Sequence, residues 1–572
     1  MPTTALVATS TGVPTSATEP ALSTFQAPDG CLPDVFFQVS YDAEQWSLHD
    51  DRLSHRQQPE CSLLLIPHGI QMSPPMQTGA IVLAGQAWET RHFPTDGMIS
   101  YLPRRDGACY FFGVSYPKGA SDETLAACRQ AAETVIDTFS STTPAHETLL
   151  LASVSSDGAA LNSTPFWLYN SQPSISASGR YVAFHTSANL VAADHNQQPD
   201  VYVHDVQTGA TELVSTGPNG AAGVSQSMST WISPDARFVA FTSTATDLLA
   251  HEIDPCALGD DDPCTQVYLR DRQNGSTELV SVAPDGSPGN RSSFGRPSLS
   301  ADGRFVVFTS DASNLTQDTP APCLSGQSFC RHVFVRDRLT GATQLVSKAS
   351  NGEPGNGESD MPTISADGRW IAYQSYASNL VDAPVDGRQI YVHDLLTGRT
   401  NLISTPASFL PGGVHHDMAM PALSADGHEI VFNVVVYPDQ TSNTPPPADP
   451  PGFLVVASRD GSEFAVVMEH IGFWPSISAD GRWITFSTEV ALAPEDANGA
   501  NDVYLFDRLT GAFRWISRPH TGTQATGGGT YASVSNDGQS VAFDSMAALL
   551  PEDQWLDADT YLWAGSAGTG RQ

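Results

Sequence analysis

Residues 297–305 read Pro-Ser-Leu-Ser-Ala-Asp-Gly-Arg-Phe, and close copies stand at 362–370 (PTISADGRW) and 475–483 (PSISADGRW). The second serine of this phrase recurs seven times, at Ser176, Ser233, Ser300, Ser365, Ser424, Ser478 and Ser535. The steps between these serines are 57, 67, 65, 59, 54 and 57 residues. A phrase that returns at such a period is typical of a repeat architecture.

Each repeat has the same internal order. The phrase with its Asp-Gly turn is followed by an alternating apolar run such as 304–308, and then by a loop of variable length. A second run such as 200–205, a Thr-Gly turn and a last run such as 211–215 complete the unit. Asp-Gly and Thr-Gly between such runs predict hairpin turns, because glycine accepts a positive φ without a Cβ clash. The pattern therefore predicts four antiparallel strands per unit, the content of one propeller blade.

The last repeat contains only three of the four strands, and its third strand is expected at 559–563. A segment ahead of the first repeat, 149–154, matches the missing fourth strand. We therefore predict a mainly β chain whose residues 147–567 form a seven-bladed β-propeller closed by an N-terminal strand. Closing the ring removes the exposed edges that would otherwise template aggregation.

The phrase S-x-S-x-D-G-R, followed by D-V-Y-V-x-D-x-x-T-G-x-T-x-L-V-S, resembles the TolB-like, WD-like β-propeller repeat of periplasmic and secreted bacterial proteins. The resemblance covers about three quarters of the chain. It implies the propeller fold and at most a role in a cell-envelope complex, because propellers host many unrelated activities. The fifth repeat departs most, with 453–457 in place of the D-V-Y-V-x-D strand.

The residues ahead of the propeller do not repeat. Residues 1–30, rich in Thr, Ser, Ala and Pro, predict a disordered segment and hold no signal-peptide pattern, as expected of a processed export product or a misassigned start. Residues 31–140 predict a small α+β domain, and 141–146 a linker. Strands are expected at 35–39, 62–66, 80–83 and 110–114. A helix is expected over 121–139, with Ser121 as its N-cap.

The eight cysteines show no metal-type spacing, so they predict disulfide bonds and an oxidising compartment. Cys256 with Cys264, and Cys323 with Cys330, flank short loops and suggest local pairs. The pairing within the remaining set stays open: Cys31, Cys61, Cys109 and Cys128.

The formal net charge is −35. A surface of this sign should repel nucleic acid and anionic membranes. No apolar run approaches the length of a membrane-spanning helix. We therefore expect an exported monomer that is periplasmic, cell-surface or secreted, with no nucleic-acid partner.

Two loops carry oxygen donors at positions one, three and seven, a spacing that suits calcium. They are Asp194, Asn196 and Asp200 in the first repeat, and Asp496, Asn498 and Asp502 in the sixth. The alternative is a pair of Asx turns that order each loop without metal. No other cofactor is expected.

The loops that lead into the innermost strands should gather around one end of the central channel, here named the channel mouth. The residues expected there differ from repeat to repeat: Gln172, Ser229, Arg296, Met361, Met420, Trp474 and Tyr531, with Asp360, His415, His416 and Asp417 beside them. Such a mixture would form a ligand pocket. The alternative is ordinary loop packing that plugs the channel.

The sequence contains no G-x-S-x-G, H-E-x-x-H or P-loop motif. We therefore expect a non-enzymatic propeller that binds a protein, peptide or glycan at the channel mouth. One alternative is a polysaccharide hydrolase or lyase that uses His415, His416, Asp417 and Arg296. Another is a structural surface protein. The Asp that recurs in the turn (Asp302, Asp367, Asp426, Asp480 and Asp537) and the recurring Arg (Arg180, Arg237, Arg304, Arg369 and Arg482) are expected to be scaffold residues, neighbours on one rim.

Overall fold

The computed structural model divides into two compact units, residues 1–147 with 566–572, and residues 148–565. In the first unit only strands β1 to β10 are described. In the second unit the structure describes residues 148–156, 158, 172–251, 253, 264–317, 330–383, 385, 387–403, 415–437, 452–519, 528–550, 553 and 558–565. The described residues form strands and turns and no helix. Among them, therefore, no helix could span a membrane.

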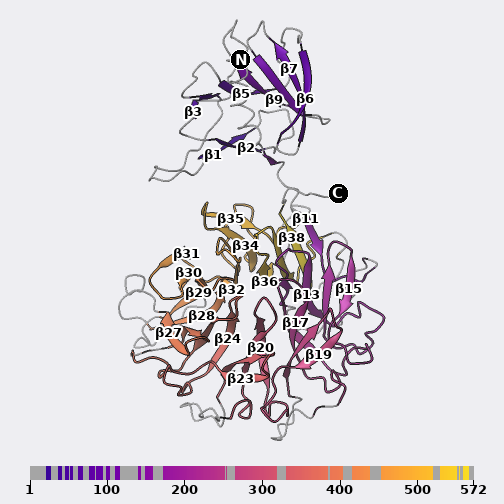
Figure 1. Ribbon diagram of the computed structural model, residues 1–572, viewed down its shortest axis with the longest axis vertical. Helices are drawn as coiled ribbons and strands as arrows, with labels where there is room; N and C mark the ends of the chain where they lie inside the picture. Colours follow the sequence, from indigo (N-terminus) through magenta and orange to yellow (C-terminus); the bar gives the residue numbers. More distant parts are fainter. Residues whose placement is uncertain are drawn as a thin grey trace. The chain divides into compact units, whose positions relative to one another are not determined.

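The second unit consists of seven four-stranded antiparallel sheets, one per blade (Figure 1). Blades one to three are β12 (Ser174–Ile175), β13 (Tyr181–Thr186), β14 (Asp200–Asp205), β15 (Ala210–Leu213); β16 (Ser227–Ile232), β17 (Phe238–Ser243), β18 (Gln266–Asp271), β19 (Ser276–Leu279); and β20 (Ser293–Leu299), β21 (Phe305–Ser310), β22 (His332–Asp337), β23 (Ala342–Leu345). Blades four and five are β24 (Ser359–Ile364), β25 (Trp370–Ser375), β26 (Gln389–Asp394), β27 (Arg399–Ile403); and β28 (His415–Leu423), β29 (Glu429–Tyr437), β30 (Gly452–Ser458), β31 (Phe464–Met468). Blades six and seven are β32 (Phe473–Ile477), β33 (Trp483–Thr488), β34 (Asp502–Asp507), β35 (Ala512–Trp515); and β36 (Gly529–Val534), β37 (Ser540–Ser545), β38 (Asp559–Ala564) with β11 (Thr148–Leu151).

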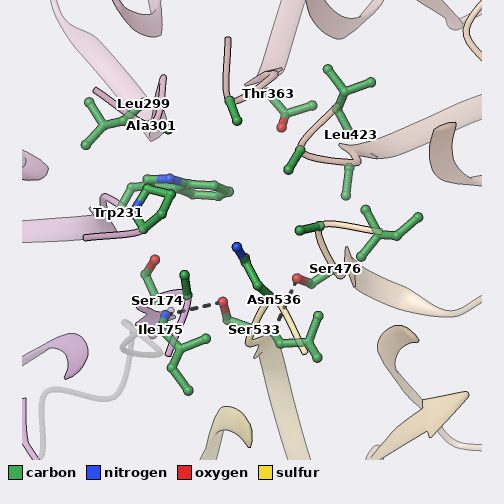
Figure 2. A pocket seen from close by; sticks show the side chains of 18 of the residues that line it. Ser174, Ile175, Trp231, Leu299, Ala301, Thr363, Leu423, Ser476, Ser533 and Asn536 are labelled. Carbon is green, nitrogen blue, oxygen red and sulfur yellow. Dashed lines mark hydrogen bonds between the residues drawn. The ribbon is translucent and has the colours of Figure 1, made fainter. Parts of the chain in front are cut away.

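The ring closes as the repeat predicts. Strand β11 pairs with β38, with Thr148 opposite Ala564 and Leu151 opposite Tyr561. The innermost strands β12, β16, β20, β24, β28, β32 and β36 contact one another in this order, and β36 contacts β12. Figure 2 shows side chains from all seven of these strands around one end of the central channel. The seven-bladed ring and its N-terminal closing strand are therefore confirmed.

The first unit contains two sheets. One has the order β1 (Ala21–Gln26), β2 (Phe36–Tyr41), β10 (Ser140–Thr142). The other has the order β3 (Trp46–His49), β4 (Arg52–His55), β5 (Ser62–Pro67), β9 (Tyr110–Ser115), β8 (Met98–Pro103), β7 (Gln86–Phe93), β6 (Gln77–Leu83). The four expected strands correspond to β2, β5, β6 and β9, whereas β1 lies within the segment expected to be disordered and β10 within the expected linker. The expected helix and Cys31, Cys61, Cys109 and Cys128 lie outside the described residues.

The Ser and Asp of the phrase build its turn. Ser300 Oγ donates to Asp302 Oδ1 at 2.6 Å and accepts from the backbone N–H of Phe305 at 2.9 Å. Asp302 Oδ1 also accepts from the backbone N–H of Arg304 at 2.9 Å. The same bonds recur in other blades, for example at Ser365, Asp367 and Arg369. The recurring aspartate is therefore a turn residue, as expected of a scaffold position.

The glycine of the phrase meets two demands at once. Gly303 has a φ of 66°, in the left-handed region that favours glycine. A Cβ at Gly303 would lie 2.2 Å from Cδ2 of Phe238, the aromatic residue that follows the phrase in the preceding blade. Gly368 and Phe305 repeat this contact between the next two blades, at 2.4 Å. The turn of each such blade therefore packs its backbone directly on its neighbour's aromatic ring.

The arginine of the phrase pairs with a different aspartate from the one expected. The side chain of Arg304 donates from Nε and Nη2 to the carboxylate of Asp337, at the end of β22, at 2.9 and 2.7 Å. Equivalent pairs are Arg180–Asp205, Arg237–Asp271, Arg369–Asp394 and Arg482–Asp507. The hydrogen bond from Arg369 holds the pKa of Asp394 down at about 2. Only the backbone of Arg304 contacts the turn aspartate Asp302, because the side chain reaches across to the third strand.

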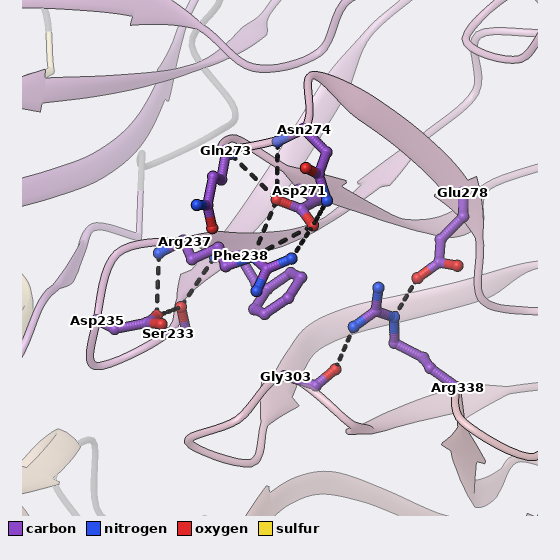
Figure 3. A network of polar contacts seen from close by, with 10 residues as sticks. All are labelled: Ser233, Asp235, Arg237, Phe238, Asp271, Gln273, Asn274, Glu278, Gly303 and Arg338. Carbon is purple, nitrogen blue, oxygen red and sulfur yellow. Dashed lines mark hydrogen bonds and ion pairs between the residues drawn. The ribbon is translucent and has the colours of Figure 1, made fainter.

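A second arginine couples neighbouring blades (Figure 3). Arg338 of blade three pairs with Glu278 of blade two and donates to the carbonyl of Gly303 at 2.6 Å. Its guanidinium lies 4.7 Å from the ring centroid of Phe238, and that of Arg237 lies 4.6 Å from the same centroid. Each cation over a ring face contributes roughly 0.5–2 kcal/mol. The aromatic residue of the phrase is thus held between two arginines and the next blade's glycine.

We expect Gly303→Ala to destabilise the protein more than Gly209→Ala. Both glycines have positive φ, but a Cβ at Gly209 would meet nothing within 4 Å. The left-handed backbone alone should cost about 1–2 kcal/mol in each variant. Overpacking against Phe238 should add about 1–3 kcal/mol in Gly303→Ala. Urea unfolding of the two variants measures the difference, and equal midpoints would contradict the packing role of Phe238.

Candidate binding site at the channel mouth

The innermost strands carry a β-bulge where the variable residues were expected. The pairing register of β24 with β25, for example, shifts between Asp360 and Thr363. Five residues in the bulges have left-handed φ values although they are not glycine: Ser229 (54°), Met361 (52°), Met420 (57°), Trp474 (53°) and Tyr531 (53°). Gln172, which precedes β12 in blade one, also has a left-handed φ, of 43°. Such a conformation costs on the order of 1–2 kcal/mol at each residue. Bulges and strained residues of this kind concentrate at functional sites.

Blade three departs from this pattern. Its register shift, between Phe294 and Ser298, spans one residue more than in blade four, and Gly295 takes the left-handed conformation with a φ of 75°. The extra residue lets Arg296 reach across the channel. It donates from Nε to the carbonyl of Thr230 at 3.1 Å and from Nη2 to the carbonyl of Pro173 at 2.6 Å.

Arg296 therefore ties three blades together. Its guanidinium lies 4.8 Å from the ring centroid of Trp231, in blade two. Burial lowers the pKa of Arg296 to about 10, and the charge of Asp544 opposes that shift. The arginine stays charged at neutral pH, with its hydrogen bonds given to backbone carbonyls of blades one and two.

The residues at the mouth separate into two arcs. Around the ring, Met361, Met420, Trp474 and Tyr531 belong to the consecutive blades four to seven. Gln172 and Ser229 belong to blades one and two. The rings of Trp474 and Tyr531 stack with their centroids 4.5 Å apart. All six side chains are partly exposed, so the mouth offers an apolar arc and a polar arc to a ligand.

A ring of buried polar residues supports these bulges. The fifth residue of the second strand in each blade is polar and at most 5% exposed. These seven residues are His185, Thr242, Thr309, Gln374, Asn433, Ser487 and Asp544. Asp544 Oδ2 accepts from the backbone N–H of Gln172 at 2.9 Å, and Gln374 Oε1 accepts from that of Met420 at 2.9 Å. In both cases the side chain holds the backbone of the left-handed residue in the next blade.

Sequence reasoning missed this ring. Its signal was present, because the second strands otherwise read as apolar repeats such as Val239-Ala240-Phe241 and Val541-Ala542-Phe543, followed by a polar residue that changes from blade to blade. A variable polar position inside a repeated apolar strand indicates a role outside the common scaffold.

The acidic residues expected at the mouth have structural partners. Asp360 accepts from Gln374 Nε2 at 2.6 Å, and its other oxygen lies 3.3 Å from Arg331 Nη1. Asp417 is buried and accepts from the backbone N–H of Arg388 at 2.7 Å. His415 and His416 open strand β28, and their side chains lie outside the described residues. Asp360 thus stands at the mouth, whereas Asp417 joins blades four and five.

Each of the two loops proposed for calcium forms a turn that is closed by its own hydrogen bonds. Asn196 Nδ2 donates to Asp200 Oδ2 at 2.7 Å, and the phenol of Tyr202 donates to Asp194. The backbone N–H of Asn196 donates to Asp194 Oδ1 at 3.2 Å, as in an Asx turn. Blade six repeats the scheme with Asn498 donating to Asp502 at 2.8 Å and Tyr504 donating to Asp496 at 2.5 Å.

This geometry favours the alternative of metal-free Asx turns. An amide nitrogen that donates to a carboxylate turns its hydrogens, and no lone pair, toward the centre of the loop. No group of three or more His, Cys, Asp or Glu residues in the described ranges could hold a metal ion. Calcium binding by these loops therefore stays a prediction without support from the hydrogen-bond pattern.

Asp200 is a buried carboxyl with a perturbed pKa. Burial raises its pKa to about 8, although hydrogen bonds from Ser215 and Asn196 oppose the shift. In blade two the same position is Gln266, whose Oε1 accepts from Ser281 Oγ at 2.6 Å. In blade two, therefore, a neutral side chain accepts the serine hydrogen bond that Asp200 accepts in blade one.

Cys264 and Cys330 each take part in a disulfide bond, as expected. Their predicted partners, Cys256 and Cys323, lie outside the described residues, so the pairing stays a prediction.

No protein-family model and no curated protein matches this chain. Solved structures that resemble it include an oligogalacturonate lyase in complex with manganese (11% identity, 87% of this chain and 98% of that one, TM-score 0.43). Others are the β-propeller domain of the Trilobed protease from Pyrococcus furiosus (12%, 70% and 96%, 0.41) and TolB from Acinetobacter baumannii (14%, 75% and 76%, 0.29). Scores below 0.5 carry no argument about activity. The β-propeller predicted from the repeat is confirmed by the chain's own strand order.

We expect Asp200→Asn to flatten the dependence of stability on pH. Between about pH 4 and pH 8 the native protein holds a proton on Asp200 that the unfolded chain releases, so raising the pH lowers the free energy of unfolding. This loss amounts to at most about 1.4 kcal/mol per pH unit. Asparagine is neutral throughout, so the variant should lose less stability between pH 5 and pH 8.

Urea unfolding at the two pH values provides the measurement. The parent protein, measured at the same two pH values, serves as the control. Identical pH profiles for the parent and Asp200→Asn would contradict a proton on Asp200.

Proposed function

We propose that this protein is an exported propeller that binds an extended peptide segment of a partner protein at the channel mouth. The observation that carries the proposal is the set of six non-glycine residues held in the left-handed conformation around the channel, five of them in β-bulges. Their side chains differ from blade to blade, whereas the scaffold residues repeat. Strain that is maintained by a dedicated ring of buried polar side chains indicates positions selected for binding.

The chemistry of the mouth favours a peptide over a glycan. Met361 and Met420 supply flexible, polarisable side chains that adapt to apolar side chains of a ligand. Trp474 and Tyr531 stack on each other, so one face of each ring is already covered. Across the ring, Gln172 and Ser229 supply hydrogen-bonding groups for a peptide backbone.

Exposed apolar residues extend this surface. Tyr376 and Met546 are 51% and 54% exposed. Tyr376 directly follows β25 and Met546 directly follows β37. The last residues of these strands pair with the first residues of the innermost strands, Ser375 with Ser359 and Ser545 with Gly529. Tyr376 and Met546 therefore lie at the mouth end of blades four and seven. Apolar residues grouped beside a cleft are typical of protein-interaction sites.

Binding is favoured over catalysis by the hydrogen bonds of the residues considered for an enzyme. Arg296 donates to two backbone carbonyls, and Asp417 accepts from a backbone amide. Both side chains would have to abandon contacts between blades in order to act on a substrate. The disulfide-bonded cysteines accord with export, because disulfides persist in oxidising compartments.

Selection from a random peptide library displayed on phage, with the full chain as bait, tests the proposal. We expect enriched peptides that carry aromatic or long aliphatic residues, and an affinity loss of at least tenfold for the double variant Trp474→Ala/Tyr531→Ala, because buried aromatic anchors dominate such interfaces. Leu339→Ala and Leu509→Ala, in exposed turns at the opposite end of the blades, provide the matched control and should bind normally.

A glycan array probed in parallel separates the alternatives. Enrichment of a glycan that depends on Trp474 would replace the peptide by a carbohydrate ligand. Peptides that bind the parent protein and the double variant equally well would place recognition away from the mouth and overturn the proposal.

A further inference from the structure

A second cavity lies at the other end of the channel, where the Asp-Gly turns meet (Figure 2). Its volume is about 120 Å³. The walls are mostly apolar and small, with the indole of Trp231, Pro234 and the alanine that follows the second serine in most blades, such as Ala301. Hydroxyl side chains complete the lining: Ser174, Thr363, Ser476 and Ser533. Engineered apolar cavities of about 150 Å³ hold a molecule the size of benzene. This cavity is therefore of the right size for a short alkyl group.

The cavity is separate from the channel mouth. Trp231 extends into it in Figure 2, and its indole lies beneath the guanidinium of Arg296. Arg296 also binds the carbonyls of Pro173 and Thr230, so these two side chains join blades one to three between the cavity and the mouth. The other blades place smaller residues at the position of Trp231, for example Thr363 and Ser476. None of the left-handed residues of the mouth lines the cavity.

Carboxylates surround this end of the channel. In six blades the residue directly after the cavity-lining residue is an exposed aspartate: Asp235, Asp302, Asp367, Asp426, Asp480 and Asp537. The arginines of the same turns give their side chains to other carboxylates, as Arg304 does to Asp337. The turn aspartates therefore surround the apolar cavity with negative charge.

We propose that this cavity binds a primary alkylammonium group, from a free amine or from a lysine side chain. The alkyl chain takes the place of water against the alanines and the Trp231 indole of the wall, which the hydrophobic effect favours. The ammonium group stays at the opening, among the turn carboxylates, where Coulomb attraction favours it and repels an anion of the same shape. Asn536, a polar side chain among the lining residues, adds an amide oxygen that accepts an N–H.

A second copy of this chain is a poor source of the ligand. The chain of 572 residues contains only two lysines, Lys118 and Lys348, so a second copy offers few ammonium groups. The net charge of −35 attracts a cationic ligand over long range. The Trp231 indole already contacts a cation within the protein, because the guanidinium of Arg296 lies 4.8 Å from its ring centroid.

Ligand-observed saturation-transfer NMR on the full chain, with n-butylammonium as the probe, tests the proposal. We expect saturation to reach the methyl and methylene protons of n-butylammonium, and to be at least threefold weaker for the neutral isostere 1-butanol and absent for butyrate. Raising the salt concentration should weaken the signal of the cation only, because salt screens exposed charges. Nα-acetyl-lysine methylamide tests whether a lysine side chain on a peptide backbone also enters.

Two variants locate the signal. Ala366→Leu fills the cavity and should reduce the saturation of n-butylammonium at least fivefold, with folding checked by its thermal unfolding. Asp302→Asn/Asp367→Asn keeps the acceptor oxygen of each turn and removes two charges, so it should weaken the cation and leave 1-butanol unchanged. Trp474→Ala, at the mouth, should change nothing here, which separates this site from the peptide site.

Three results would overturn the proposal. Equal saturation of n-butylammonium and 1-butanol would show a cavity that selects only for apolar surface. An undiminished signal in a folded Ala366→Leu variant would place the amine elsewhere. No saturation of any probe would show that the cavity is closed to ligands.

Discussion

The contact on which the ring depends is the one between the turn glycine of a blade and the aromatic ring of the blade before it. Gly303 lies so close to Phe238 that no Cβ fits between them. Arg237 and Arg338 cover the faces of the same ring, and Arg338 also binds Glu278 and the carbonyl of Gly303. One short phrase thus joins strand to strand within a blade and blade to blade around the channel. This explains why the chain repeats it so closely.

Because these contacts hold the ring together, other positions are released from structural demands. The bulge residues of the innermost strands and the fifth residues of the second strands vary from blade to blade. The two sets are physically linked, since Gln374 holds the backbone of Met420 and Asp544 that of Gln172. The buried side chains of Gln374 and Asp544 thereby gain hydrogen-bond partners, and the strained backbone at Met420 and Gln172 gains support.

The channel is divided into two ends with different chemistry. At the mouth, side chains that differ in every blade produce an apolar arc beside a polar one, which suits recognition of a ligand without symmetry. At the turn end, nearly identical residues from seven blades produce an apolar cavity with a charged rim. The insertion of one residue in blade three places Arg296 between them.

The sequence by itself determined the number of blades, the four strands in each, the closing strand β11 and the place of the variable residues at the mouth. These follow from local rules, because alternating apolar residues and glycine turns depend on neighbours in the chain. Only the tertiary structure decided that Arg304 pairs with Asp337 and not with its neighbour Asp302, and that Arg296 crosses to two other blades. The side chains of Asp194, Asn196 and Asp200 likewise had the spacing of metal ligands, but packing turned their hydrogen bonds toward one another and toward Tyr202. Spacing along a chain specifies which groups can meet, whereas the direction in which each donor and acceptor points is set by contacts between residues that are distant in sequence.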